Sequence, residues 1–212
     1  MFTNTHIKQQ EIKKTVEFCR FPQDLHIHTT YSVGDSAIVE EQTIEFIAGI
    51  KHAEVVGISD HLESFAGYDA FCAYEKIVRA HGLYLGTEVN GADSVPFALA
   101  LNTDYYIYHC FDTKADYKGA ENLANTGKPL IIAHPTALGT NLDRVPPESY
   151  IEINNRYIWR KNWRQAFEKY VNRFHFVISS DAHQPFMLAQ HTARHIAGEL
   201  GVKATILFEP NH

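Results

Sequence analysis

Six short apolar runs in this chain each end in a histidine or a carboxylate. The runs are rich in β-branched and aromatic residues, which is typical of buried strands. They end in Asp24-Leu25-His26-Ile27-His28, Ile58-Ser59-Asp60-His61, Leu85-Gly86-Thr87-Glu88, Ile107-Tyr108-His109, Ile131-Ile132-Ala133-His134 and Ser179-Ser180-Asp181-Ala182-His183. If the runs are neighbouring strands of one sheet or barrel, their carboxyl ends meet and the polar side chains converge on a single metal site.

Two of these endings carry polar residues one position apart. Side chains alternate between the two faces of a strand, so His26 and His28 point the same way, as do Asp181 and His183. Each pair can therefore share one cation. A lone histidine at a strand end is more often a satisfied polar group, but two chelating pairs among six endings favour metal binding. Imidazole and carboxylate together suit Zn, Mn or Fe(II) better than Ca or Mg.

Asp35 allows two interpretations. It follows the polar loop after His28 and directly precedes Ser36, where the apolar spacing predicts the start of a helix. Asp35 or Ser36 can be the N-cap of that helix. The loop can also bring the Asp35 carboxylate back over the strand end as a metal ligand, and both roles are compatible.

Strands and helices are predicted to alternate along the chain, which indicates an α/β barrel whose site lies at the carboxyl ends of the strands. The Gly91 to Asn102 stretch is expected to form an extra hairpin, and the proline-rich residues 136–149 a loop without a helix. Strands are expected over 24–28, 55–59, 83–89, 105–109, 130–134, 150–154 and 175–179, and helices over 36–51, 68–80, 116–125, 159–172 and 186–200.

The length of 212 residues and the 45% hydrophobic content predict one domain, with residues 1–21 as an N-terminal arm. The formal charge is −6 and the chain has no long basic run, so binding to duplex nucleic acid is not expected. No apolar run is long enough to span a membrane. The three cysteines form no CxxC pair, and we expect a reducing, cytoplasmic location.

The polar residues taken together resemble the motifs of the PHP family, named for polymerase and histidinol phosphatase. The series is His26-x-His28, Asp35, Asp60-His61, Gly86-x-Glu88, His109, His134-Pro135 and Asp181-x-His183, and it spans residues 24 to 183 in order, about three quarters of the chain. The resemblance implies a distorted (β/α)7 TIM-like barrel in a single domain, with two or three divalent ions (Zn, Mn or Fe) at its C-terminal mouth.

The resemblance also implies how the ligands are shared. His26, His28, Glu88 and Asp181 would hold one ion. Glu88 would bridge to a second ion held by His109 and His134, and a third ion would lie between Asp35, His61 and His183.

The activity expected from this resemblance is hydrolysis of a small phosphomonoester, such as histidinol phosphate, a nucleotide or a sugar phosphate, by a metal-activated hydroxide. Arg156, at a strand end, and Arg144, on the proline-rich loop, are the candidates for phosphate binding. Two alternatives remain: a nuclease that trims short oligonucleotides, and a non-catalytic module stabilised by metal. Trp159 and Trp163 have helical spacing and are expected to serve packing rather than base stacking.

Overall fold

Parallel strands form both sheets of the structure, a computed structural model that describes residues 20–210. The first sheet has the order β1 (Phe21–Asp24), β2 (Ala53–Ile58) and β3 (Tyr84–Leu85). The second has the order β4 (Glu88–Asn90), β5 (Tyr106–His109), β6 (Leu130–Ile132), β7 (Tyr150–Asn154) and β8 (His175–Ser179). Neighbours in each sheet follow one another along the chain, so helical crossovers connect them.

Backbone contacts join the two sheets at two places. Beyond β1, Ile27 forms a parallel bridge with Ala182, which follows β8. Beyond β2, His61 forms a parallel bridge with Glu88, the first residue of β4. The carboxyl ends of strands from both sheets are thereby held next to one another.

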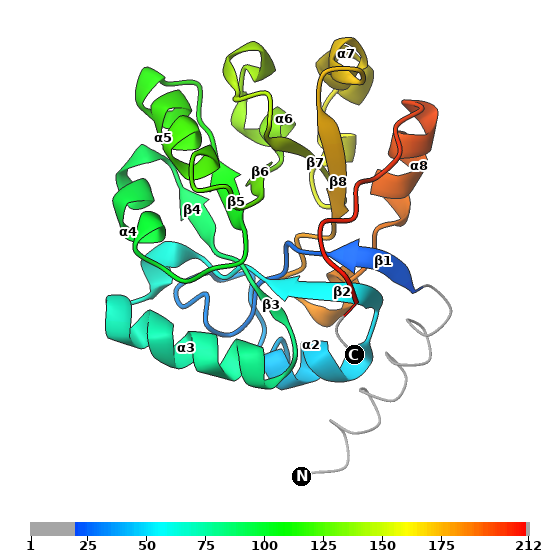
Figure 1. Ribbon diagram of the computed structural model, residues 1–212. Helices are drawn as coiled ribbons and strands as arrows, with labels where there is room; N and C mark the ends of the chain where they lie inside the picture. The colour runs from blue at the N-terminus through cyan, green and yellow to red at the C-terminus, as the bar shows by residue number, and fades with distance from the viewer. Residues whose placement is uncertain (1–19, 211–212) are drawn as a thin grey trace.

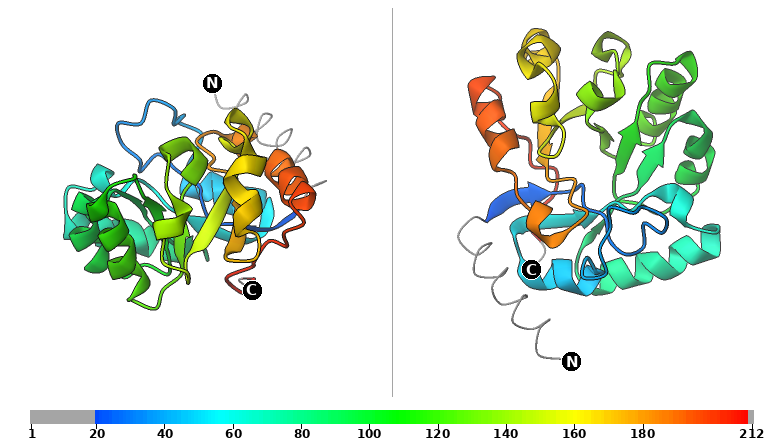
Figure 2. Two further views of the ribbon diagram at one scale, coloured as in Figure 1. Left: turned by 90° about the horizontal axis from the view of Figure 1, so that it is seen from above. Right: turned by 180° about the vertical axis from the view of Figure 1, so that it is seen from behind.

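Seven α-helices lie within the described residues, and together with the sheets they form one α/β domain. Figure 1 shows α2 and α3 beneath the first sheet and the later helices beside the second, and Figure 2 shows the same arrangement from two further sides. The helices are α2 (Ile44–Ile50), α3 (Tyr68–Ala80), α4 (Val95–Leu99), α5 (Lys114–Ala124), α6 (Pro135–Leu138), α7 (Trp163–Phe167) and α8 (His191–Glu199).

Short 3-10 helices occupy several connections. They are η1 (Leu62–Ser64), η2 (Ala92–Ser94), η3 (Leu142–Arg144), η4 (Ile158–Arg160), η5 (Glu168–Tyr170) and η6 (Pro185–Met187). No helix among residues 20–210 has the length and apolar character needed to cross a membrane.

The hydrophobic core consists of two clusters. The larger packs the helices against the sheets, and the smaller takes Leu25, Val55, Tyr105, Ile107, Ile131, Ala133 and Val177 from strands of both sheets or residues beside them. Tyr105 is fully buried in the smaller cluster and donates a hydrogen bond of 2.6 Å to the carbonyl of Leu25. Gly57 and Gly86 make room for its ring, since a Cβ on either would lie within 2.4 Å of a Tyr105 atom.

Several predicted elements are correct. Helix α3 and strands β7 and β8 have the predicted bounds, and α5 begins two residues before the predicted start. The predicted strand over 83–89 is interrupted into β3 and β4. The strand predicted over 24–28 is wrong in its bounds, because β1 covers Phe21–Asp24 and beyond it only Ile27 forms an isolated bridge.

Other predictions are wrong. The helix expected over 36–51 begins only at Ile44, where Thr43 caps it by accepting from the backbone NH of Phe46, so Asp35 is not its N-cap. The expected hairpin over 91–102 is η2 followed by α4, with Pro96 in the first turn, where its missing NH is tolerated. The 136–149 loop contains α6 and η3.

The predicted helix over 159–172 is divided into η4, α7 and η5, because Asn162 caps a new helix at its middle. The last predicted helix is similarly divided into η6 and α8. The predicted N-terminal arm lies almost wholly outside the described residues.

Candidate metal centre

The nine residues predicted as metal ligands lie together at the carboxyl ends of the strands. Their side-chain nitrogens and oxygens form a continuous set of contacts of 4.0 Å or less. Four groups of three residues each have ligand atoms within 4.8 Å of one another and could hold a metal ion. They are His26-His28-Glu88, Glu88-His109-His134, His26-His134-Asp181 and His28-His61-His183.

Glu88 lies at the centre of the cluster and is only 2% exposed. Its Oε1 is 3.0 Å from Nε2 of His26 and 2.5 Å from Nε2 of His109. Its Oε2 is 2.6 Å from Nδ1 of His61 and 3.6 Å from Nε2 of His28. Glu88 thus belongs to two of the groups that could hold an ion, but the histidines are not divided between its oxygens as predicted, because His26 and His28 face different oxygens.

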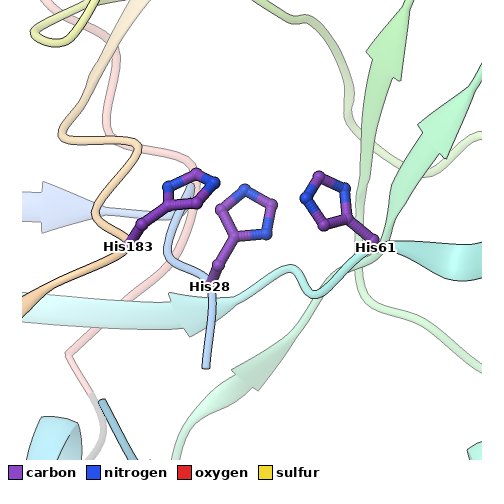
Figure 3. Close-up of side chains that lie close together, drawn as sticks. All are labelled: His28, His61 and His183. Atoms are coloured by element: carbon purple, nitrogen blue, oxygen red, sulfur yellow. The ribbon is translucent and has the colours of Figure 1, made fainter. Parts of the chain in front are cut away.

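His28, His61 and His183 come from three separate segments, and the ring of His28 lies between those of His61 and His183 (Figure 3). Asp35 lies beside two of them, with Oδ2 3.2 Å from Nε2 of His61 and 3.0 Å from Nε2 of His183. Its other oxygen accepts a hydrogen bond of 2.7 Å from the NH of Ala37. Asp35 thus stabilises a turn and also faces the histidines.

Charge within the cluster favours ionised carboxylates. Burial alone would raise the pKa of Glu88, but the charges of His109, His28 and His26 outweigh it and hold that pKa well below the ordinary value. Burial and the neighbouring histidines His183 and His61 lower the pKa of His28. Carboxylate and imidazole groups together form the donor set that a divalent transition metal prefers, and the histidines would bind it in their neutral form.

Glu152 was not predicted as a site residue, and the structure places it directly behind the cluster. It is fully buried in β7, and its Oε1 accepts from Nδ1 of His26 at 2.7 Å. Its Oε2 accepts from the backbone NH of His134 at 2.6 Å. Because Nδ1 of His26 is occupied, Nε2 is the nitrogen presented to a cation. The sequence signal was Glu152-Ile153-Asn154, which repeats the alternation of the two chelating pairs.

Asn154 extends this support to Asp181. Its Nδ2 donates to Oε2 of Glu152 at 3.0 Å and to Oδ2 of Asp181 at 3.1 Å. One amide group thereby orients two carboxylates of the same strand-end cluster.

Asp60, although quoted in the motif series, has a different role. Its carboxylate accepts hydrogen bonds from Thr29, Ser32 and Tyr74, at 2.6 to 2.8 Å. Asp60 therefore fixes the loop that follows His28 and has no place among the groups that could hold an ion.

Two candidate ligands have a left-handed backbone conformation, with φ of 24° at His134 and 55° at Asp181. A non-glycine residue in this region costs on the order of 1–3 kcal/mol, and such residues concentrate at functional sites. The hydrogen bond from the NH of His134 to Glu152 helps to hold one of these turns.

The residues present fit a set of bound cations. Several buried ligand atoms have no hydrogen-bond partner among the described residues, namely Oε2 of Glu88, Nδ1 of His61 and Nδ1 of His134. The first two lie 2.6 Å apart and form an ion pair when His61 is protonated, so Nδ1 of His134 is the atom that most clearly lacks a partner. Buried polar atoms left in this way need a further partner, and a metal ion supplies one.

The two arginines predicted to bind phosphate lie in different surroundings, and only one of them is at the cluster. Arg156 lies beside the cluster, with Nη1 3.4 Å from Oδ1 of Asp181 and 3.0 Å from Nε2 of His183. Arg144 instead pairs with Asp112 at 3.3 Å and packs 4.0 Å over the ring of Tyr117. Only Arg156 is in contact with candidate ligands.

Comparison of the sequence with protein-family models and with curated proteins finds no match.

Proposed function

We propose that this protein is a metal-dependent phosphoesterase that hydrolyses a small phosphomonoester. The observation that carries the proposal is the position of Glu88, which belongs to two groups that could hold an ion, one with His26 and His28 and the other with His109 and His134. A structural metal site needs only one enclosed ion. A shared carboxylate between histidine groups is suited instead to two or more adjacent ions, the arrangement used for phosphate-ester hydrolysis.

Two or three divalent ions (Zn, Mn or Fe) would be held by the nine predicted residues. They would supply a water of lowered pKa and positive charge for the phosphoryl oxygens. The chain's own contribution is orientation: Glu152 holds His26, and Asn154 holds Asp181. Arg156, which contacts Asp181 at the edge of the cluster, would donate hydrogen bonds to the phosphate.

A closed barrel of the (β/α)7 type is part of this proposal. Its support is the pair of bridges, Ile27 with Ala182 and His61 with Glu88, and the inner cluster around Tyr105. In such a barrel β3 and β4 would act as one interrupted strand. The site would then lie at the C-terminal mouth, where barrel enzymes carry their chemistry. A cytoplasmic location also belongs to the proposal and is supported by the odd cysteine count.

The experiment is a metal analysis followed by a phosphatase assay. Protein loaded with Mn, Zn or Fe should bind at least two ions per chain and release phosphate from a generic aryl phosphate. Glu88→Ala, purified and loaded in the same way, is the matched control and should release none. Absence of turnover with every metal, despite full loading, would contradict the proposal and leave a metal-stabilised module as the better description.

A further inference from the structure

Trp159 is exposed next to the candidate site, contrary to the packing expected from its helical spacing. The indole is 62% exposed on η4, the first element after β7. Trp163, four residues later, is partly buried against the core and does behave as a packing residue. The exposure of Trp159 therefore needs a reason other than the core.

A series of contacts between aromatic rings and a guanidinium group connects the metal cluster to Trp159. The ring of Tyr157 lies 4.8 Å from the ring of His134, measured between centroids. The guanidinium of Arg160 lies 4.6 Å from the Tyr157 ring and 5.2 Å from the Trp159 ring. We call Tyr157, Trp159 and Arg160 the β7 platform. It begins against a candidate metal ligand and ends at an exposed indole.

The platform lies in a basic stretch of an otherwise acidic chain. Residues 153–167 include Arg156, Arg160, Lys161 and Arg164 but no acidic residue, whereas the whole chain has a formal charge of −6. Arg164 is paired with Glu168 and Glu199. Within the described part of the chain, neither Arg160 nor Lys161 has a carboxylate within ion-pair distance. This surface therefore favours an anionic ligand.

We propose that the β7 platform binds the base of a nucleoside phosphate whose phosphate lies at the metal cluster. The inference rests on the proposed function and specifies its substrate class. A base is planar and stacks on tyrosine, tryptophan and arginine, while its phosphate is drawn to Arg156. A plain sugar phosphate offers no ring for the platform. A substrate with a cationic group is disfavoured by Arg160 and Lys161.

A binding experiment tests the base directly. The chain contains two tryptophans, so Trp163→Phe leaves Trp159 as the only indole reporter. Phosphonate analogues that cannot be hydrolysed replace AMP and ribose phosphate in these binding measurements. In the Mn-loaded Trp163→Phe protein, the AMP analogue should quench the fluorescence of Trp159 and bind more tightly than the ribose phosphate analogue, which lacks the base. Removing a stacking partner typically weakens binding by about fivefold to a hundredfold. Trp159→Ala should therefore lower the AMP to ribose phosphate affinity ratio by about that factor, measured by calorimetry.

Phe186→Ala is the matched control, since this phenylalanine is 72% exposed and follows the candidate ligand His183 by three residues. Phe186→Ala should leave the AMP to ribose phosphate affinity ratio unchanged. Trp159→Phe, which keeps an aromatic ring, should retain most of the wild-type ratio. Equal affinities for AMP and ribose phosphate, or equal losses in Trp159→Ala and Phe186→Ala, would overturn the inference.

Turnover separates this inference from the proposed function. If the protein hydrolyses phosphomonoesters without preferring AMP to ribose phosphate, the phosphoesterase proposal stands and the β7 platform assignment is wrong. If it hydrolyses none yet binds AMP through Trp159, the platform stands and the phosphoesterase proposal is wrong. A dinucleotide with a terminal phosphate, compared with AMP, shows whether the base belongs to a free nucleotide or to the end of a strand.

Discussion

Glu152 and His26 form a hydrogen bond of 2.7 Å, and both side chains are fully buried. Burial opposes the charge on Glu152, but His26 outweighs it and lowers the pKa of this carboxyl to about 2. Glu152 is therefore ionised throughout the range in which the protein would work. A carboxylate in this position fixes the ring of the histidine and makes its other nitrogen a better metal ligand.

Glu152→Gln should weaken metal binding about 10- to 100-fold without emptying the site, because the side chain keeps its shape but loses its charge. Competition with a zinc-binding dye measures the effect. Glu148→Gln, at an exposed position in the loop before β7, is the control and should bind like the wild type. Unchanged affinity in Glu152→Gln would mean that His26 is oriented without this carboxylate.

Glu88→Ala and Asp35→Ala should differ in the number of ions lost. Glu88 contacts histidines on two sides, so its removal should reduce the bound metal by at least two ions per chain and abolish turnover. Asp35 contacts only His61 and His183 in the cluster, so its removal should affect one ion. Elemental analysis of the two purified variants gives the counts. Wild-type metal content in Asp35→Ala would show that this residue only stabilises its turn.

Arg156→Ala should raise KM for phosphomonoesters while leaving the metal content unchanged. A charge-assisted hydrogen bond to a phosphate contributes about 1.5–3 kcal/mol, so kcat/KM should fall roughly ten- to a hundredfold. Arg144→Ala is the matched control, because Arg144 contacts Asp112 and Tyr117 rather than the cluster. Equal kinetics in the two variants would remove Arg156 from phosphate binding.

Metal affinity should increase with pH through His61. Burial disfavours its charged form, but Glu88 and Asp35 outweigh burial and raise the pKa of His61 from 6.5 to about 9. A metal ion binds the neutral imidazole, so binding releases this proton below pH 9. Affinity for the ion at His61 should rise by up to about tenfold per pH unit and level off above pH 9.

The same group has the opposite effect on the metal-free protein. Its folded pKa is raised, so the protonated histidine contributes stability that is fully present below pH 6.5 and is lost as the pH rises through about 9. Urea unfolding of the metal-free protein should show that the free energy of unfolding falls between pH 6.5 and about 9. In His61→Gln this fall should be smaller. A metal affinity independent of pH would exclude His61 as a ligand.

Gly86→Ala should destabilise the fold by about 1–3 kcal/mol or more, because the new methyl group would lie 2.3 Å from the buried ring of Tyr105. Gly49→Ala, within α2, meets no atom within 4 Å and should instead stabilise by about 0.5–1 kcal/mol. Chemical denaturation of both variants measures the difference. Equal stabilities would mean that Tyr105 moves readily and does not fill the space beneath the site.

Predictions from the sequence were most accurate where one local rule decides the structure. The apolar runs of β7 and β8 are almost continuously buried, and α3 buries residues at helical spacing, so all three have the predicted bounds. The convergence of His109, His134 and Glu88 followed from the shared direction of parallel strands. None of these required knowledge of long-range packing.

The features missed by sequence depend on contacts between distant residues. In the sequence, Glu152 has the pattern of an ordinary strand residue. Its role depends on His26, which lies 126 positions away in the chain and contacts it only in the fold. Helix α2 starts eight residues later than predicted, where Thr43 caps it, and Asp35 instead contacts His61. Trp159 has the spacing of a core residue, but the break at Asn162 places it on a separate short helix.

The left-handed turns at His134 and Asp181 have a consequence for selection. Glycine at either position would relax the backbone but remove a candidate ligand. A search for heat-resistant variants performed with a chelator present should therefore enrich glycine at these two positions, whereas a search in metal-containing medium should reject it. The residue found at these two positions would therefore distinguish selection for stability alone from selection for metal binding.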